Sequence, residues 1–327
     1  MDTNQRPKPL RLLELPTDLQ HDIIRNMNFL AIFHLSTFRA FRRNAGKRRY
    51  WTELCLKLEK DSEKDCIDVL QNETRVERIL LHNDAVASEH RAGDKLVVAH
   101  SVTDLAKKIK GKHEDPREHV LRHLLQVFHF KTKKLDCKRD INEQKDSFVW
   151  NSIPMFDMVY LSGGSFWSSD HINMASEEIE IFLRRIKSDY YGIAVSVDDK
   201  SYKCRRAFGT QCLRLQHTTN WLEIDNILAR ENNLMNIDLC KLSDSQANSM
   251  LKQWIYGNCG DFLVMMLNAE HTFSEAETFK DIDLKAWEPS EEDEDPKLLG
   301  QTGKLACIRR KCDGESMELF EYPLLFN

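Results

Sequence analysis

The chain has 327 residues, of which 41% are hydrophobic and 30% charged, and its formal net charge is −5. This length favours about two domains with a sizeable core, and the composition is typical of a globular protein, not of a disordered one. The charge balance argues against a strong binder of nucleic acid or of anionic membranes. No apolar run approaches the roughly 20 residues that span a bilayer, and the first residues lack the apolar core of a signal peptide. We therefore expect an intracellular protein, cytoplasmic or nuclear.

Nine cysteines are scattered along the chain, and no two of them form a Cys-x-x-Cys pair. An odd number of cysteines in an intracellular protein favours free thiols, several of them buried, over a disulfide framework or a zinc site. We expect neither a metal site nor a cofactor.

The first 50 residues are basic, with a local charge of +6, whereas the remainder carries −11. This shift predicts a boundary after residue 50, with domains at residues 8–50 and 51–327. Thr17 and Gln20 have the spacing of a capping box, which predicts a helix that begins just after Pro16. Its apolar residues recur at helical spacing, and they are Leu19, Ile23, Ile24, Met27 and Leu30.

A second short helix is predicted around Phe33, Leu35 and Phe38, so the first domain is a small all-α unit. About forty residues bury too little surface to be securely stable alone, and part of the apolar surface is therefore expected to contact a partner. Core and interface remain equal alternatives for most of these residues, whereas Leu15 and Pro16 favour an interface.

The second domain is predicted to be α/β. Apolar runs at residues 55–58, 78–81 and 95–99 predict edge strands and hairpins within residues 54–100. Helical spacing predicts helices at 120–128, 175–186, 221–228 and 247–255, and the last is opened by a capping box of Ser243 and Gln246. Between these helices, apolar runs predict strands centred on Leu135, Val159, Val195, Leu213, Met235 and Leu263.

The spacing of these strand centres scatters around the 20–29 residues of leucine-rich repeats, although no asparagine ladder accompanies them. We therefore predict an irregular leucine-rich-like βα repeat domain, with a parallel sheet built from βα units at residues 115–270. An acidic loop is predicted at 288–296, and Asp313-Gly314 predicts a hairpin at 303–322.

Several conspicuous residues have plain structural explanations. His119 and His123 are four residues apart, but no third ligand is evident, which favours histidines on the surface or flanking the buried stripe over metal ligands. The arginines and lysines between residues 39 and 49 favour a solvated helix end over a nucleic-acid patch. Trp254 and Trp221 are expected to be packing anchors, and Asn248 is expected to bind the backbone of an adjoining loop. No set of nucleophile, base and orienting group can be assembled, so we expect no catalysis.

Two stretches resemble known modules. The pattern Leu13-x-Leu15-Pro16, with Ile23-Ile24 and Leu35-Ser36 after it, looks like an F-box. Asn248-Ser-Met-Leu-Lys-Gln-Trp254 and the preceding 221–228 segment are similar to the type-2 F-box-associated domain, a family greatly expanded in nematodes. Met250 stands where that motif usually has an aromatic residue. The likeness covers residues 10–50 and 115–320.

This resemblance implies a substrate-recruiting adaptor subunit of an SCF-type E3 ubiquitin ligase, itself non-catalytic. Its F-box would bind the Skp-type adaptor of a cullin-based ligase, and its C-terminal domain would bind an unknown protein substrate, with no nucleic acid or membrane involved. The residues that it assigns to adaptor binding are Leu13, Leu15, Pro16, Leu19, Ile23, Ile24, Met27, Leu30 and Leu35. The alternative is an interaction scaffold that acts independently of any ligase.

Loops after the predicted strands are the candidates for substrate binding, because solenoid-like sheets bind partners on such surfaces. Phe166 and Trp167 are consecutive aromatic residues in a glycine-containing turn that opens with Gly163-Gly164, and Thr218 and Thr219 lie in a second loop. Exposed aromatic residues on loops are typical interface hot spots. A ring tucked over the sheet edge is an equal alternative.

Overall fold

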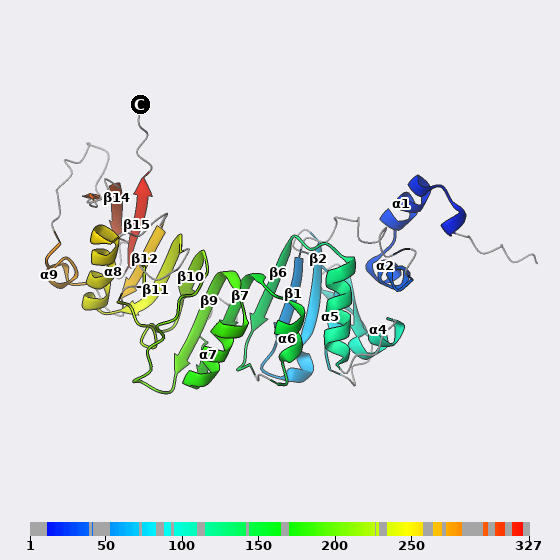
Figure 1. The fold of residues 1–327 in the computed structure, drawn as a ribbon, viewed down its shortest axis with the longest axis horizontal. Coiled ribbons are helices and arrows are strands. Elements are labelled where there is room, and N and C mark those ends of the chain that lie inside the picture. The colour runs from blue at the N-terminus through cyan, green and yellow to red at the C-terminus, as the bar shows by residue number, and fades with distance from the viewer. Residues whose placement is uncertain are drawn as a thin grey trace, which may run out of the picture. The chain divides into compact units, whose positions relative to one another are not determined.

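The structure is a computed structural model, and the two parts into which the chain divides are shown in Figure 1. It describes residues 12–38, 41, 53–71, 74–82, 88–92, 95–109, 115–141, 144–164, 170–225, 227–228, 234–257, 264–269, 273–282, 297–299, 305–310 and 316–322. Unit 1 comprises residues 1–54 and 66–131, and unit 2 comprises residues 55–65 and 132–327. The predicted boundary after residue 50 thus falls inside unit 1, and the separate 8–50 domain stays a prediction.

Unit 1 begins with helices. A short 3-10 helix (Leu12–Glu14) precedes α1 (Thr17–Arg25) and α2 (Phe29–Ser36), and α4 (Val102–Lys108) and α5 (Pro116–Val127) follow later. Its strands are β2 (Cys66–Gln71), β3 (Thr74–Leu80), β4 (Ser88–Ala92) and β5 (Lys95–Ser101). Their order is β2-β3-β5-β4, with β2–β3 and β4–β5 antiparallel and β3–β5 parallel. The runs in β3 and β5 are not edge strands, because β3 lies between β2 and β5 and β5 lies between β3 and β4, whereas the predicted hairpins are present as β2–β3 and β4–β5.

Helix α2 is anchored to α5 by aromatic packing. The rings of Phe29 and Phe128 stack with centroids 5.1 Å apart, and the ring of Phe33 meets the imidazole of His123 edge-on at 5.1 Å. The Oγ of Ser36 lies 2.9 Å from Nε2 of His123. His119 and His123 are both buried, so of their two predicted positions the surface one was wrong. A buried polar ring needs a partner, and α2 supplies one to His123.

Unit 2 is built on a largely parallel sheet. Its parallel strands are β6 (Thr132–Cys137), β7 (Phe156–Ser162), β9 (Ser188–Val197), β10 (Cys212–Leu215), β11 (Asn236–Leu242) and β12 (Val264–Ala269). Each pairs with the next in chain order. Beside β6 lies β1 (Glu53–Leu58), and β8 (Ile172–Met174) pairs with β9. All six predicted strand centres lie in or next to these strands, and the predicted parallel sheet is confirmed.

Helices cover one side of this sheet. They are α6 (Ser147–Ser152), α7 (Ser176–Arg185) and α8 (Asp244–Tyr256), and Figure 1 shows α6 and α7 against the same face of the strands. When successive parallel strands are added to a sheet in one direction through right-handed crossovers, every connecting segment lies on the same side of the sheet. The strands accordingly alternate, with residues such as Leu213 and Leu215 buried and their neighbours half-exposed.

The predicted capping box of α8 is confirmed. The Ser243 hydroxyl accepts from the N–H of Gln246, whose side chain accepts from the N–H of Ser243 at 2.9 Å. Asn248 donates to the carbonyls of Thr278 and Lys280, both at 2.9 Å, as predicted for a residue that binds an adjoining loop. These bonds hold the segment of α9 (Glu275–Thr278) against α8.

Antiparallel strands complete the sheet beyond β12. Strand β15 (Ser316–Tyr322) pairs with β12 and with β14 (Leu305–Arg310), which also pairs with β13 (Lys297–Leu299). The predicted C-terminal hairpin is confirmed in its strands. Its Asp313-Gly314 turn and the acidic loop at 288–296 lie outside the described residues.

Three predicted helix features were wrong. Residues 221–225 and 227–228 are not helical, because their backbone groups bond to other segments: the N–H of Cys204 donates to the carbonyl of Trp221, and the Gln253 side chain donates to that of Ile224. The helical spacing of the apolar residues in this segment reflects which side chains are buried and not a helical backbone.

The predicted start of α1 just after Pro16 is confirmed, but Pro16 is the N-cap, so the predicted capping box of Thr17 and Gln20 was wrong, and the Gln20 side chain donates to the carbonyl of Leu15 at 2.7 Å. The helix also ends at Arg25, so Met27 lies after it and Leu30 belongs to α2.

Candidate functional site

Helix α1 and the residues that flank it carry a partly exposed apolar face. Leu19 is 51% exposed and Pro16 is exposed, whereas Leu15, Ile23 and Met27 are half-buried. Phe38, just past α2, is 59% exposed. A face of this kind on a helix is a candidate contact surface for a protein partner.

The other residues predicted to bind the adaptor lie deeper. Ile24 is 2% exposed and belongs to the core of unit 1, and Leu30 and Leu35 are half-buried on α2. The side chain of Leu13 lies outside the described residues. The structure therefore brings Leu15, Pro16, Leu19, Ile23 and Met27 together on one short segment, but places Ile24 beneath them.

A cavity of about 650 Å³ lies in unit 2, where β9, β10 and β11 end. This is the carboxyl edge of a parallel sheet, where open α/β folds bind their ligands, and the volume lies in the range of small-molecule sites. The lining includes Thr218, one of the predicted substrate-binding residues, whereas Thr219 is fully buried. Phe166 and Trp167 lie outside the described residues.

Basic groups converge on this cavity from three segments. Lys200 and Lys203 follow β9, His217 follows β10, and Lys241 lies near the end of β11. The imidazole of His217 stacks on that of His171, with centroids 3.6 Å apart. Burial lowers the pKa of His217, and the charges of His171 and Lys241 lower it further, so the ring is neutral at pH 7.

Sequence reasoning missed these lysines as site residues. Each lies in or within a few residues after a correctly predicted strand, and in a parallel sheet such positions share one edge. The position of these lysines after predicted strands was the available signal. Using that signal requires knowing which strands are neighbours in the sheet, and the sequence alone did not establish the strand order.

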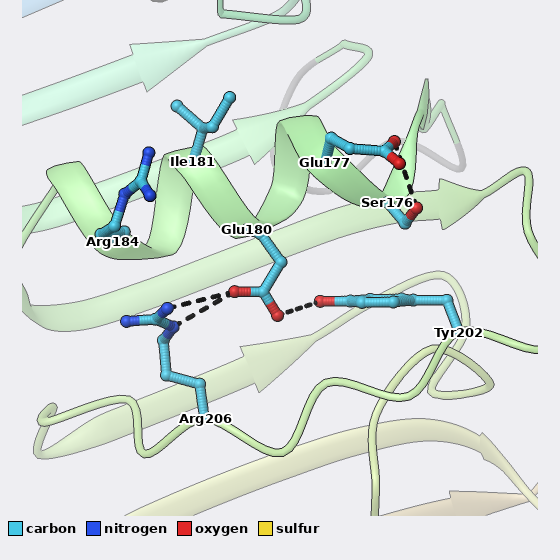
Figure 2. Close-up of a pocket in the computed structure, with 7 residues that line it drawn as sticks. All are labelled: Ser176, Glu177, Glu180, Ile181, Arg184, Tyr202 and Arg206. Carbon is cyan, nitrogen blue, oxygen red and sulfur yellow. Dashed lines mark hydrogen bonds and ion pairs between the residues drawn. The ribbon is translucent and has the colours of Figure 1, made fainter.

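A second hollow, of about 480 Å³, lies beside α7. Its lining includes Tyr202 and Arg206, which belong to the same segment as Lys200 and Lys203. Figure 2 shows Glu180 between two side chains of that segment. Its carboxylate accepts from the Tyr202 hydroxyl at 2.6 Å and pairs with the Arg206 guanidinium at 3.2 Å. Burial and the bond to Glu180 raise the pKa of Tyr202, which therefore stays a neutral donor. Glu180 thus positions one wall of the cavity.

The sheet face opposite the helices carries half-exposed polar and aromatic residues. The rings of Tyr160 and Tyr190 lie 5.5 Å apart, and Arg214 pairs with Asp238 at 2.8 Å. Burial raises the pKa of Tyr190 to about 12, so its phenol remains protonated. Tyrosine and arginine are enriched in protein interfaces, which makes this face a second candidate contact surface.

Burial keeps several of the described thiols protonated. Six cysteines whose side chains the structure describes are free, and four of them are buried. Burial raises the pKa of Cys137 to about 12 and that of Cys240 to about 11, so both are thiols at neutral pH. Within the same residues no three metal-ligating side chains gather, and no helix is long and apolar enough to cross a bilayer.

Comparison of the chain with protein-family models, with curated proteins and with solved structures gave no match.

Proposed function

We propose that the chain is a substrate-recruiting adaptor subunit of an SCF-type ubiquitin ligase, in which α1 binds the Skp-type adaptor and unit 2 binds a protein substrate. The observation that carries the proposal is the partly exposed apolar face of α1, centred on Leu19. The resemblance of residues 13–36 to an F-box names the partner for that face.

The two N-terminal helices differ in how deeply their apolar side chains are buried, and this difference supports the proposed role. Helix α2 buries Phe29, Ile32 and Phe33 within unit 1, whereas on α1 only Ile24 is buried, Ile23 is half-buried and Leu19 is exposed. The more buried helix thus attaches the pair to the unit, and the more exposed one offers side chains to a partner. For the substrate, the half-exposed tyrosines of the sheet and the cavity at its carboxyl edge are the contact surfaces in unit 2.

The packing of α2 also favours a second candidate function. Because the N-terminal helices already bury one of their faces on α5, they can belong to an interaction scaffold that needs no ligase. The two functions differ in a single measurable property, which is affinity for a Skp-type adaptor.

The test is the affinity of the full chain for a purified Skp-type adaptor. Each apolar side chain buried in such an interface contributes about 1.5–3 kcal/mol, so Leu19→Ala combined with Ile23→Ala is expected to weaken binding at least tenfold. Arg25→Ala is the matched control, because Arg25 is exposed on the same helix. An unbound wild-type chain, or a double variant that binds as tightly as the wild type, would refute the adaptor role and leave the scaffold.

A further inference from the structure

The cavity at the ends of β9, β10 and β11 has the chemistry of an anion site. Three lysines reach it from two segments, Lys200 and Lys203 from one and Lys241 from the other. Asp198 and Asp199 also line it, but the carboxylate of Asp199 already accepts from the backbone N–H and the hydroxyl of Ser201 at 2.8 and 2.6 Å. Three lysines against two carboxylates still give the lining a net positive charge, and the Lys203 ammonium, which has three N–H donors, uses one of them on the carbonyl of Asn220.

Lys241 is held in a strained conformation at this cavity. Its φ is 55°, in the left-handed region that residues other than glycine rarely adopt. The pairing of β11 with β12 is also irregular between Leu239 and Leu242. Such a backbone costs free energy and persists where the surrounding structure enforces it, and bulges of this kind re-aim side chains at binding sites. The irregularity places Lys241 among the lining residues.

The loop after β10 adds an independent sign of a ligand. Trp221 lines the cavity and is 2% exposed, yet its indole Nε1 has no hydrogen-bond partner among the described residues. The indole N–H is a hydrogen-bond donor, the kind of group that an anion satisfies. A buried polar atom that lacks a partner is costly, and a bound ligand is one way to satisfy it.

We propose that this cavity binds an organic phosphate monoester, with Lys203, Lys241 and His217 facing the phosphate. Lysine ammonium groups bind phosphate as point charges, and three of them line this cavity. The volume exceeds that of a phosphate group alone and leaves room for an organic part beside Val197 and Trp221.

The site does not depend on the adaptor function, and the phosphate can belong to a free small molecule or to a phosphoserine side chain. Isothermal titration calorimetry of the full chain distinguishes the two sources. Glycerol phosphate is the first probe, and a short peptide with one phosphoserine is the second, beside its unphosphorylated form. A dissociation constant below about 1 mM for at least one phosphorylated probe is expected. Binding of glycerol phosphate assigns a small molecule, and binding of the phosphopeptide alone assigns a protein side chain.

Charge-removing variants locate the site. Lys203→Gln combined with Lys241→Gln is expected to weaken binding at least tenfold. Lys187→Gln is the matched control, because Lys187 is an exposed lysine at the amino end of β9. No binding of either phosphorylated probe, or equal affinity in the double variant, would overturn the proposal.

Lys241→Asn provides a second test of the site if the double variant folds poorly. Asparagine tolerates a positive φ better than lysine does, so this variant is expected to melt at a higher temperature than the wild type and to bind the phosphorylated probe at least tenfold more weakly. A folded Lys241→Asn chain with wild-type affinity would also overturn the proposal.

Discussion

Arg139 is the charged side chain on which two buried carboxylates of unit 2 depend. Its guanidinium reaches Asp65 at 2.9 Å and Asp146 at 2.8 Å, and the carboxylate of Asp146 is fully buried. Burial raises the pKa of Asp65, and the bond to Arg139 opposes that rise. The three groups connect the loop after β1 to the loop after β6.

Replacing Arg139 by Met is expected to lower the free energy of unfolding by about 3–5 kcal/mol, because two buried carboxylates lose their counter-charge. The pKa of Asp65 would rise further in this variant. Since the folded state would then hold a proton that the unfolded state releases, the loss is expected to shrink as the pH falls from 7 toward 5.

Urea unfolding at both pH values measures this loss. Arg205→Met is the control, since Arg205 is 80% exposed and its ion pair with Glu223 is expected to contribute less than about 1 kcal/mol. Equal stability of the Arg139 and Arg205 variants would contradict the assigned role.

Gly163 is required by a close approach of two backbone segments. A Cβ at this position would lie 2.4 Å from the carbonyl oxygen of His171, which stacks on His217 at the cavity. Gly163→Ala is expected to cost roughly 1–3 kcal/mol and to shift the imidazole resonances of His217, because the His171 backbone must move. Urea unfolding and proton NMR measure the two effects. An alanine variant with the wild-type midpoint and spectrum would show that this contact imposes no constraint.

At the scale of elements, the attachment of α2 is expected to depend on pH. His34 of α2 accepts from Lys108 Nζ of α4 at 2.9 Å. Burial lowers the pKa of His34 below its ordinary value of 6.5, and the charges of Lys108 and His100 lower it further. The unfolded state therefore binds a proton first as the pH falls, so stability is lost on acidification below about 6.5.

The measurement is the urea midpoint of the wild type and of His34→Gln between pH 7.5 and 5.5. The variant is expected to lose less stability over this range, and Lys108→Gln is expected to lie between the two, because it removes one cause of the lowered pKa. Identical pH dependences in all three proteins would rule His34 out as the titrating group. His217, whose pKa is also lowered, contributes with the same sign in unit 2.

The elements also show how far the sequence could be read. The strands of unit 2 were predictable because buried parallel strands contain short apolar runs, as in Ile193 to Val195 of β9. The 221–228 segment has the same burial at helical spacing, but its backbone bonds to residues distant in sequence, which periodicity cannot reveal. The buried histidines of α5 were misread for a similar reason, since the partner of His123 is Ser36, far away in the chain.

At the scale of the whole molecule, one candidate site could be predicted from local sequence and the other could not. The α1 face follows from the spacing of apolar residues within one helix, and the sequence predicted Leu15, Leu19 and Ile23 there. The cavity depends on which strands are neighbours and on a left-handed residue in β11. Neither feature has a local signature, and of the two predicted substrate-binding residues that the structure describes, Thr218 lies in the lining of the cavity and Thr219 does not.

The order of the strands in unit 2 has a consequence for how the chain is made. From β6 to β12, each new parallel strand pairs with the one synthesised just before it, so no strand waits for a distant segment to leave the ribosome. Contacts that are close in sequence form quickly, and a sheet of this kind can grow residue by residue from its amino-terminal end. Throughout that growth the newest strand is an unpaired edge, open to pairing with another chain. The antiparallel β15 covers the edge of β12 last, so a nascent chain is most prone to aggregate just before its final residues emerge.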